Sequence, residues 1–366
     1  MINKNILLFI PMIDGGGVEK NFFIIANFFI KHFKQVTVIT TSKEFRSRLN
    51  NKIKFITPKN NFWSKIQNRR LKIIICLYLV FKYSLKNNQF TTLSFHGNLY
   101  CCLLCKLLGQ KIILRSNSSI SGWSKNFFKK FVYKNISRLS DKIIVNSLDF
   151  KKEYKKEFNL NVHCIYNPLN RKEIFKRSKL KPKISFFKKD TLNFLNVGRL
   201  VNQKDQITLL KAFKLIKIKT KIKFKLLIIG RGVKKKELED FIIKNNLIAE
   251  IKIINFQNNP YPYFKKANCF VLSSLYEGLP NVLLESLTLK KFVISSNCPT
   301  GPKEILDNGK GGVLFRIKNE KDLYKKILFY SKNKKKCNKL IKHGYERLSR
   351  FDFNLNLKKY MQLINF

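Results

Sequence analysis

Acidic residues are scarce in this chain, which has 22 Asp and Glu against 74 Lys and Arg in 366 residues and therefore a formal net charge of +52. A charge of that size favours polyanionic partners, either nucleic acid or anionic lipid headgroups. Part of the excess has a compositional origin, because Lys, Asn, Ile and Phe are abundant together, as an AT-rich coding sequence produces. The chain is not a disordered one, since 45% of its residues are hydrophobic, enough for packed cores.

Long apolar runs are missing as well. The run IIICLYLVF within residues 69–86 is too short to span a bilayer and has lysines on both sides, so we expect a buried helix or an interfacial one. The N-terminal MINKNILLFIPMIDGGG has too short an apolar run for a signal peptide, which predicts a reducing, cytoplasmic location. In that location the eight cysteines are expected as reduced thiols. Cys102 and Cys105 form a C-x-x-C among leucines with no second ligand pair, so buried thiols are favoured over a metal or redox site.

The pattern of strands and helices predicts two α/β domains, which the length also suits. The first half contains βαβ units: a strand at 5–10, a glycine turn at 15–17, a helix at 20–32 and further strands at 36–40, 91–95, 111–114 and 143–147. A basic, proline-broken segment at 171–190 is the predicted linker. We therefore expect an N-terminal domain at 1–170, a C-terminal domain at 191–348 that opens with a strand at 192–197, and a final helix at 349–366.

The segment 269–289, CFVLSSLYEGLPNVLLESLTL, carries the chemistry. Its apolar start predicts a buried parallel strand, and Pro280 suits the first position of a helix that follows a short loop. This places Glu277 in the loop and Glu285 on the helix, with Gly278 allowing the backbone to approach a ligand. Two carboxylates can accept hydrogen bonds from hydroxyls while the helix N-terminus holds phosphate between them. A diphosphate with a sugar at each end fits that arrangement.

The run E-G-L-P-N-V-L-L-E resembles the EX7E signature of retaining nucleotide-sugar glycosyltransferases of family 4, a GT-B fold group. Other motifs match in the family's order: the Gly15–Glu19 turn, Gly198-Arg199-Leu200 with Lys204, I-I-G-R-G around Gly230, and I-N-F-Q-N-N around Gln257. The run C-P-T-G-P-K-E-I at 298–305 resembles the subgroup that extends cell-surface polysaccharide or lipid-linked oligosaccharide. The resemblance implies two Rossmann-like domains facing across a cleft, with the C-terminal helix crossing back to the first.

The resemblance also implies roles for individual residues. Glu277 holds the transferred sugar, Glu285 accepts from the ribose, and Arg199 and Lys204 stabilise the departing diphosphate, so Glu277, Arg199 and Lys204 form the catalytic set. The expected nucleotide-sugar contacts are Gly16, Gly17, Gly198, Arg199, Lys204, Gly230, Gln257, Glu277, Gly278, Leu279 and Glu285. No D-x-D occurs in the sequence, so neither a metal nor another cofactor is expected.

The acceptor side departs from the family pattern. Many members have a histidine after the strand that corresponds to 111–114, where this chain has Arg115-Ser116-Asn117-Ser118, while His96 ends the preceding strand. Glu19, His96, Arg115 and Asn117 are candidates for acceptor or sugar contacts, and His96 is equally well explained as a packed residue.

The partners implied are a nucleotide sugar, most simply a UDP-sugar, a glycan or lipid-linked acceptor, and an anionic membrane surface. In 122–134, GWSKNFFKKFVYK, the rings of Trp123, Phe127, Phe128 and Phe131 can share one helical face flanked by Lys125, Lys129 and Lys130. The alternatives are membrane attachment at the inner face, or aromatics packed into the core. A nucleic-acid-binding α/β protein is the alternative function; no RNP, zinc-finger or helix-turn-helix pattern supports it.

Overall fold

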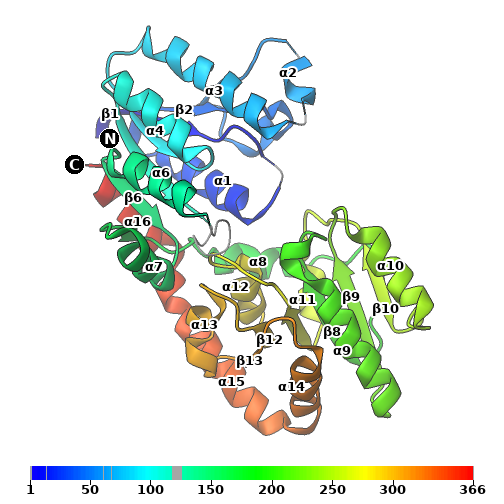
Figure 1. Cartoon of the computed structure of the whole chain (residues 1–366). Coiled ribbons are helices and arrows are strands. Elements are labelled where there is room, and N and C mark those ends of the chain that lie inside the picture. Colours follow the sequence, from blue (N-terminus) through cyan, green and yellow to red (C-terminus); the bar gives the residue numbers. More distant parts are fainter. Residues whose placement is uncertain (1, 14, 61, 67, 118–125, 366) are drawn as a thin grey trace. The chain divides into compact units, whose positions relative to one another are not determined.

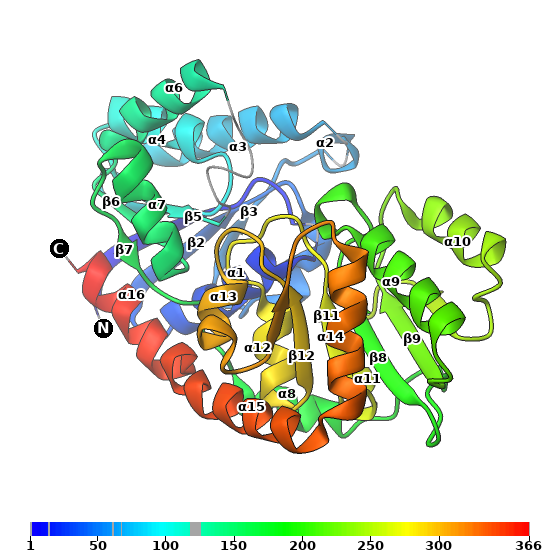
Figure 2. The same ribbon diagram turned by 60° about the horizontal axis from the view of Figure 1, so that its bottom comes forward.

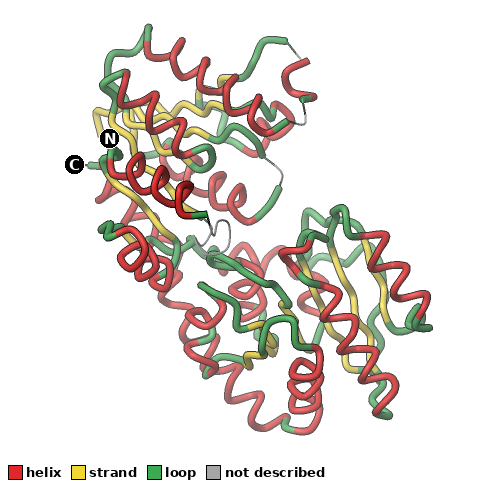
Figure 3. The backbone as a smooth tube through the Cα atoms, in the orientation of Figure 1, coloured by secondary structure: helices red, strands yellow, loops and turns green. Residues whose placement is uncertain are grey.

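The structure, a computed structural model, describes residues 2–13, 15–60, 62–66, 68–117 and 126–365. The chain divides into two compact units (Figure 1): a first unit of Met1–Pro168 with Asn354–Phe366, and a second unit of Leu169–Phe353. Each unit contains a parallel sheet with helices on both of its faces, as the tube drawing in Figure 3 shows. The predicted fold class of two parallel α/β domains is confirmed.

The first unit is built on a seven-stranded sheet in the order β3-β2-β1-β4-β5-β6-β7, in which every pair runs parallel. The central strands are buried on both faces, as is usual in parallel sheets, although β4 buries Thr91, Thr92 and Ser94 beside its one apolar residue, Leu93. The strand order reverses between β1 and β4. The strands are β1 (Ile2–Phe9), β2 (Phe33–Ile39), β3 (Lys54–Ile56), β4 (Thr91–Ser94), β5 (Lys111–Ser116), β6 (Lys142–Val145) and β7 (His163–Cys164).

Helices cover both faces of this sheet (Figure 2). On one face α3, α4, α6 and α7 share a core with alternate residues of the strands. On the other face, the Phe29 ring of α1 meets the Tyr360 ring of α16 at 6.3 Å between centroids. The helices are α1 (Gly17–Phe29), α2 (Phe62–Lys65), α3 (Arg69–Ser84), α4 (Asn98–Leu107), α6 (Phe127–Arg138), α7 (Leu148–Phe158) and α16 (Phe353–Ile364).

Several expectations for this unit need correction. Helix α1 begins at Gly17 and not at Lys20, with Gly16 as its N-cap. Strand β5 does not end at Leu114 but continues to Ser116, because Arg115 pairs with Ile144 of β6. The predicted interfacial segment begins outside the described residues, where Trp123 and Lys125 lie, and α6 starts at Phe127.

The predicted burial of the cysteines in the C-x-x-C segment is observed. Cys101, Cys102 and Cys105 are fully buried on α4, and all eight cysteines are thiols within the described residues. Helix α3, expected at 69–86 as a buried or an interfacial helix, is buried on the side of Cys76, Val80 and Tyr83 and exposed on the other side. Among the residues that the structure describes, no helix combines the length and apolar character that crossing a bilayer requires.

The second unit is built on a six-stranded parallel sheet in the order β10-β9-β8-β11-β12-β13. Its strands are β8 (Leu192–Val197), β9 (Phe224–Ile229), β10 (Ile251–Ile254), β11 (Cys269–Leu272), β12 (Phe292–Ser296) and β13 (Val313–Phe315). Its helices are α8 (Arg171–Ser178), α9 (Gln206–Lys219), α10 (Lys235–Lys244), α11 (Tyr261–Lys266), α12 (Asn281–Thr288), α13 (Pro302–Ile305), α14 (Glu320–Lys332) and α15 (Lys334–Glu346). Aromatic side chains stack in part of the core: the ring centroids of Phe292 and Tyr330 lie 4.7 Å apart.

The basic segment predicted as a linker, residues 171–190, begins with helix α8, which packs against α11 and α12. Arg177 of α8 donates from Nη2 to the carbonyl of Asn258 at 2.6 Å, and its guanidinium lies over the Tyr261 ring. The first part of the segment is therefore folded onto the second unit.

Candidate active site

The sheet of the second unit reverses its strand order between β8 and β11. In open parallel sheets, ligands bind outside the carboxyl ends of the strands at such a reversal, because the connections on its two sides leave in opposite directions. Lys204 follows β8 and Glu277 follows β11. The Lys204 Nζ lies 2.5 Å from the Glu277 Oε1, with only 16% and 8% of the two side chains exposed. A largely buried ion pair thus stands at the edge where this fold binds ligands.

Backbone and side-chain hydrogen bonds fix the two loops that carry this pair. The Leu275 N–H donates to the Gln203 carbonyl at 2.8 Å, and the Gln203 Nε2 donates to the Tyr276 carbonyl at 2.9 Å. The Ser273 hydroxyl donates to the Lys204 carbonyl at 2.8 Å. Arg199 is exposed beside them, with its Nη2 3.0 Å from the Gln203 Oε1. Gln203 and Ser273 were not predicted, although Gln203 directly precedes Lys204 in the motif.

The glycine turn after β9 packs directly on the turn after β8. A Cβ at Gly230 would collide with the Gly198 carbonyl oxygen, so the two turns approach this closely only because residue 230 has no side chain. The structure therefore brings together Gly198 and Gly230, which are both predicted to contact the nucleotide sugar.

The C-P-T-G-P run supports Glu277 from behind. Thr300, in a left-handed conformation with φ of 57°, donates from Oγ1 to the Glu277 carbonyl at 2.5 Å. At Gly301, φ is 85° and an added Cβ would collide with the Gly278 carbonyl oxygen. Burial, and secondarily the nearby Glu277 carboxylate, raise the pKa of the Cys298 thiol to about 12. Cys298 is therefore an uncharged packing residue at neutral pH.

Glu285 lies on α12 and is 5% exposed. The Tyr261 hydroxyl donates to the Glu285 Oε1 at 3.4 Å, a contact that the sequence did not predict. Pro280 is the N-cap of α12 and not its first helical residue, with ψ of 106° in the extended region. Gly278 and Leu279 lie in the loop between the two glutamates, and Leu279 is buried.

Gln257 is placed differently from the rest. It follows β10, which is an edge strand separated from β8 by β9. Its Nε2 donates to the Asn255 carbonyl at 3.0 Å. Its loop is held by α8 through the bond from Arg177 to Asn258, so contact with a nucleotide at this position stays a prediction.

The first unit has its own reversal, between β1 and β4, and several predicted residues follow these strands. Gly16 and Gly17 form the start of α1 after β1, and Glu19 in its first turn is 6% exposed. His96 is half-buried just after β4. The structure thus places this group at the carboxyl ends of neighbouring strands, and its roles stay predictions.

Arg115 has a structural task that the sequence did not reveal. It is 1% exposed, and its Nε donates to the Tyr360 hydroxyl of α16 at 2.8 Å. Its Nη2 donates to the Asn167 Oδ1 at 2.7 Å, and its Nη1 donates to the Asn117 Oδ1. Asn117 in turn donates to the Phe95 carbonyl at 3.1 Å. Three of the five N–H donors of Arg115 are therefore used within the first unit, where the bond to Tyr360 attaches α16 to the sheet.

Two further features bear on ligands. In the described ranges no group of three or more His, Cys, Asp or Glu residues could hold a metal ion.

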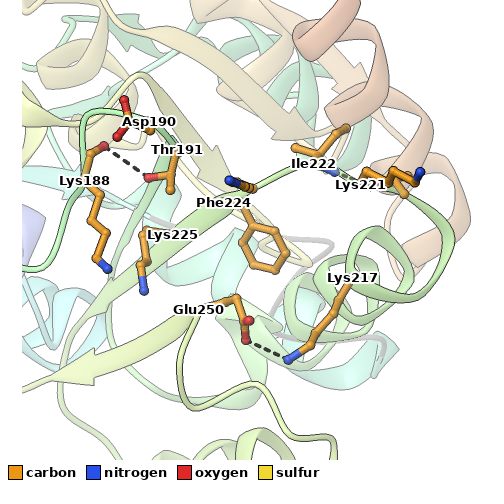
Figure 4. A pocket seen from close by; sticks show the side chains of 11 residues that line it. Lys188, Asp190, Thr191, Lys217, Lys221, Ile222, Phe224, Lys225 and Glu250 are labelled. Carbon is orange, nitrogen blue, oxygen red and sulfur yellow. Dashed lines mark hydrogen bonds and ion pairs between the residues drawn. The ribbon is translucent and has the colours of Figure 1, made fainter.

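A cavity of about 470 Å³ opens at the amino ends of β8 and β9, the edge opposite Glu277 (Figure 4). Its Lys217 pairs with Glu250 at 3.0 Å and its Lys225 donates to the Ala249 carbonyl. Protein atoms thus already hold these two lysines, so we do not place the donor there.

Solved structures match this arrangement over its whole length. The crystal structure of Anabaena HepE in complex with UDP covers 99% of both chains with a TM-score of 0.79 at 15% identity. The sucrose-phosphate synthase of Thermosynechococcus elongatus covers 99% of this chain and 98% of its own, with a TM-score of 0.80 at 17% identity. The fold is that of the GT-B glycosyltransferases.

Residues 177–347, which lie within the second unit, match the family model of glycosyl transferases group 1. An uncharacterized glycosyltransferase of Methanocaldococcus jannaschii is 37% identical to this chain over 199 aligned residues. The alignment covers 52% of this chain and 48% of the relative, so the chain spans about half the length of that relative. A Campylobacter jejuni relative is 26% identical over 97% of this chain and 96% of its own. It is the GalNAc-alpha-(1->4)-GalNAc-alpha-(1->3)-diNAcBac-PP-undecaprenol alpha-1,4-N-acetyl-D-galactosaminyltransferase.

Proposed function

We propose that the protein is a retaining glycosyltransferase that moves a hexose or N-acetylhexosamine from a UDP-sugar to a lipid-linked glycan or cell-surface polysaccharide. The observation that carries this proposal is the Lys204–Glu277 pair, held at the strand reversal of a glycosyltransferase group 1 domain. The UDP bound to the Anabaena structure supports the nucleotide, and the name of the Campylobacter relative supports a lipid-linked acceptor.

The pair suits departure of a nucleoside diphosphate. Leaving UDP gains negative charge, so fixed cations beside it stabilise the transition state more than the ground state. The Lys204 ammonium has three N–H donors and can hold both Glu277 and a phosphate oxygen. Arg199 adds a second cation on the same loop. The N-terminus of α12 adds a helix dipole that is favourable for the phosphates.

The two glutamates take separate tasks in this proposal. Glu277, fixed by Lys204 and Thr300, accepts hydrogen bonds from hydroxyls of the transferred sugar near its reacting carbon. Glu285 accepts from the ribose, oriented by Tyr261. No carboxylate pair is assigned to a double displacement in this mechanism. The acceptor hydroxyl therefore attacks the anomeric carbon from the face that the diphosphate leaves, and the leaving phosphate takes the hydroxyl proton. The anomeric configuration of the transferred sugar is retained. No metal is required.

Peripheral binding at the cytoplasmic face of the membrane completes the proposal, because an undecaprenol-linked acceptor of the kind named for the Campylobacter relative is a membrane lipid. Gly16, Gly17, Glu19 and His96 stay assigned to donor and acceptor binding as predicted.

The test is UDP release by the purified protein across a panel of UDP-sugars, with product configuration read from the anomeric proton coupling. We expect one donor to be preferred, the product to retain its configuration, and EDTA to leave the rate unchanged. An inverted product or loss of activity in EDTA would contradict the mechanism. Failure of every donor, together with no UDP binding by calorimetry, would contradict the function itself.

A further inference from the structure

An apolar stripe runs along the outer side of α3. Its members recur at alternating spacings of three and four residues, which places them on one helical face. They are all exposed large hydrophobics: Leu71, Ile74, Tyr78, Phe81 and Leu85. The opposite side of the helix carries Cys76, Val80 and Tyr83, which are buried in the core of the first unit. Helix α3 is therefore apolar on both sides, and the sheet covers only one of them.

Helices α4 and α6 repeat this arrangement. On α4, Tyr100, Leu103 and Leu107 are exposed at spacings of three and four, and Leu107 is 85% exposed. On α6, Phe127 and Phe128 are 83% and 72% exposed, and Phe131 is also exposed. The interpretation that these aromatics pack into the core is wrong for all three phenylalanines. The inner side of this helix carries Tyr133, Ile136 and Ser137, and the Tyr133 hydroxyl meets that of Tyr154 at 2.6 Å.

The three helices lie side by side in one layer. Helix α4 packs against α3 on one side and against α6 on the other, and all three share one core beneath them. Figures 1 and 2 show α4 between its two neighbours from both directions. Their exposed side chains therefore form one surface, which we call the α3-α4-α6 face. A soluble monomer seldom exposes contiguous apolar area of this kind unless something binds there.

The three helices of this face carry charged residues of one sign. No Asp or Glu occurs between Glu44 and Asp141, a stretch that holds 19 Lys and Arg. This stretch includes every residue of α3, α4 and α6. Exposed lysines stand among the apolar side chains, as Lys82 and Lys86 do at the end of α3 and Lys129 does on α6. Two neighbouring carboxylates pair with lysines of these helices, Asp141 with Lys106 at 2.8 Å and Glu157 with Lys130 at 2.7 Å. Lys82, Lys86 and Lys129 outnumber them beside the apolar side chains, and such a combination complements an anionic bilayer surface.

We propose that the α3-α4-α6 face inserts its apolar side chains into an anionic lipid bilayer, with its lysines on the headgroups. This rests on the proposed function, since it identifies the surface that brings the enzyme to a membrane acceptor. A second copy of this chain fits the face less well, because two such faces would bring like charges together. A spanning segment is not needed, because each apolar group and each lysine adds to binding independently.

The test is co-sedimentation with vesicles that contain no acceptor, in the absence of any sugar donor, so its outcome does not depend on transferase activity. We expect binding to phosphatidylglycerol vesicles at 0.1 M salt and at least tenfold weaker binding to phosphatidylcholine vesicles. Two triple variants separate the contributions. The apolar variant carries serine at Ile74, Tyr78 and Phe128, and the charge variant carries glutamate at Lys82, Lys86 and Lys129. Each is expected to weaken binding by at least tenfold.

Matched controls come from exposed residues of the second unit. The apolar control carries serine at Val233, Ile243 and Ile248, and the charge control carries glutamate at Lys335, Lys336 and Lys339. Both are expected to bind as the parent does. The proposal is overturned if neutral vesicles bind equally well, if the apolar variant keeps full binding, or if the controls lose as much as the variants. The proposal is also overturned if the parent is a dimer in sedimentation equilibrium and the apolar variant is a monomer with unchanged vesicle binding. That result would assign the face to a contact between two copies of the chain. UDP release that persists in a variant that no longer binds vesicles would show that the donor site is intact.

Discussion

At the scale of single residues, the site is organised around the Lys204–Glu277 contact of 2.5 Å. A charged side chain that is largely removed from water destabilises the fold unless an opposite charge lies beside it. Lys204 supplies that charge and leaves N–H groups for a ligand. The pair is thus both a structural unit and a prepared site for an anion.

Arg199 and Lys204 are predicted to act on the departing diphosphate. Replacing either by alanine removes a charge-assisted contact in the transition state, and turnover should fall on the order of 10²-fold. The measurement is kcat for UDP release with the preferred donor. Lys219→Ala, an exposed lysine at the far end of α9, serves as the control and should retain the parent rate. Rates within a factor of two of the parent in Arg199→Ala or Lys204→Ala would refute the assignment.

Glu277 and Glu285 are predicted to differ in what they control. Glu277→Gln weakens the bond to Lys204 and the hold on the sugar, so turnover should fall by about 10²-fold with little change in UDP affinity. Glu285→Gln loses a charged acceptor for the ribose, and UDP affinity should fall by roughly tenfold or more. Calorimetry for UDP and steady-state rates for kcat separate the two effects. UDP binding to Glu285→Gln with the parent's affinity would mean that the ribose contact is elsewhere.

At the scale of helices and strands, the sequence predicted most of what the structure contains. Strand β8 has the predicted bounds of 192–197, and Glu277 and Glu285 lie in the loop and on the helix as predicted. These succeeded because buried parallel strands are nearly continuous apolar runs and their ends are sharp. Strand β5 was predicted two residues too short, because Arg115 looks like a surface residue until its partners Tyr360 and Asn167 are known.

The remaining site contacts depend on long-range pairing. Gln203 lies next to Lys204 in the chain, but its partners Leu275 and Tyr276 come more than 70 positions later. Tyr261 meets Glu285 from a different helix. Local periodicity carries no information on such contacts, because they arise only when the sheet places the loops side by side. The exposed stripe of α3 was ambiguous for the same reason, since an apolar helix can be buried or interfacial.

The Arg115–Tyr360 bond is predicted to hold α16 on the first unit. Tyr360→Phe removes the acceptor of a charged donor that is 1% exposed, which should cost about 1.5–3 kcal/mol. For a unit of this size, the melting temperature should fall by roughly 3–12 °C. Hydrogen exchange of the backbone amides of α16, Phe353–Ile364, should also become faster in this variant. Tyr78→Phe, at an exposed position on α3, is the control, and an equal loss in that variant would argue against a specific anchor.

At the scale of the whole molecule, the net charge of +52 opposes folding. Like charges held in a compact structure repel one another, and the unfolded chain relieves that repulsion by expanding. Ion pairs offset little of it, because 22 acids cannot partner 74 bases and most of the pairs lie at the surface. Added salt shortens the screening length from about 10 Å at 0.1 M to about 3 Å at 1 M, which weakens the repulsion.

The melting temperature is therefore predicted to rise by several degrees between 0.1 M and 1 M NaCl, where a chain stabilised by surface ion pairs would gain nothing or lose stability. Thermal unfolding followed by circular dichroism measures this shift. The triple glutamate variant on α15 (Lys335, Lys336 and Lys339) supplies the internal comparison. Each exchange of Lys for Glu lowers the charge by two, so three exchanges bring +52 to +46, and the dependence on salt should become shallower. A melting temperature that falls with NaCl would contradict the prediction, because it would mean that the charges of the folded chain attract one another on balance and that screening removes a stabilising contribution.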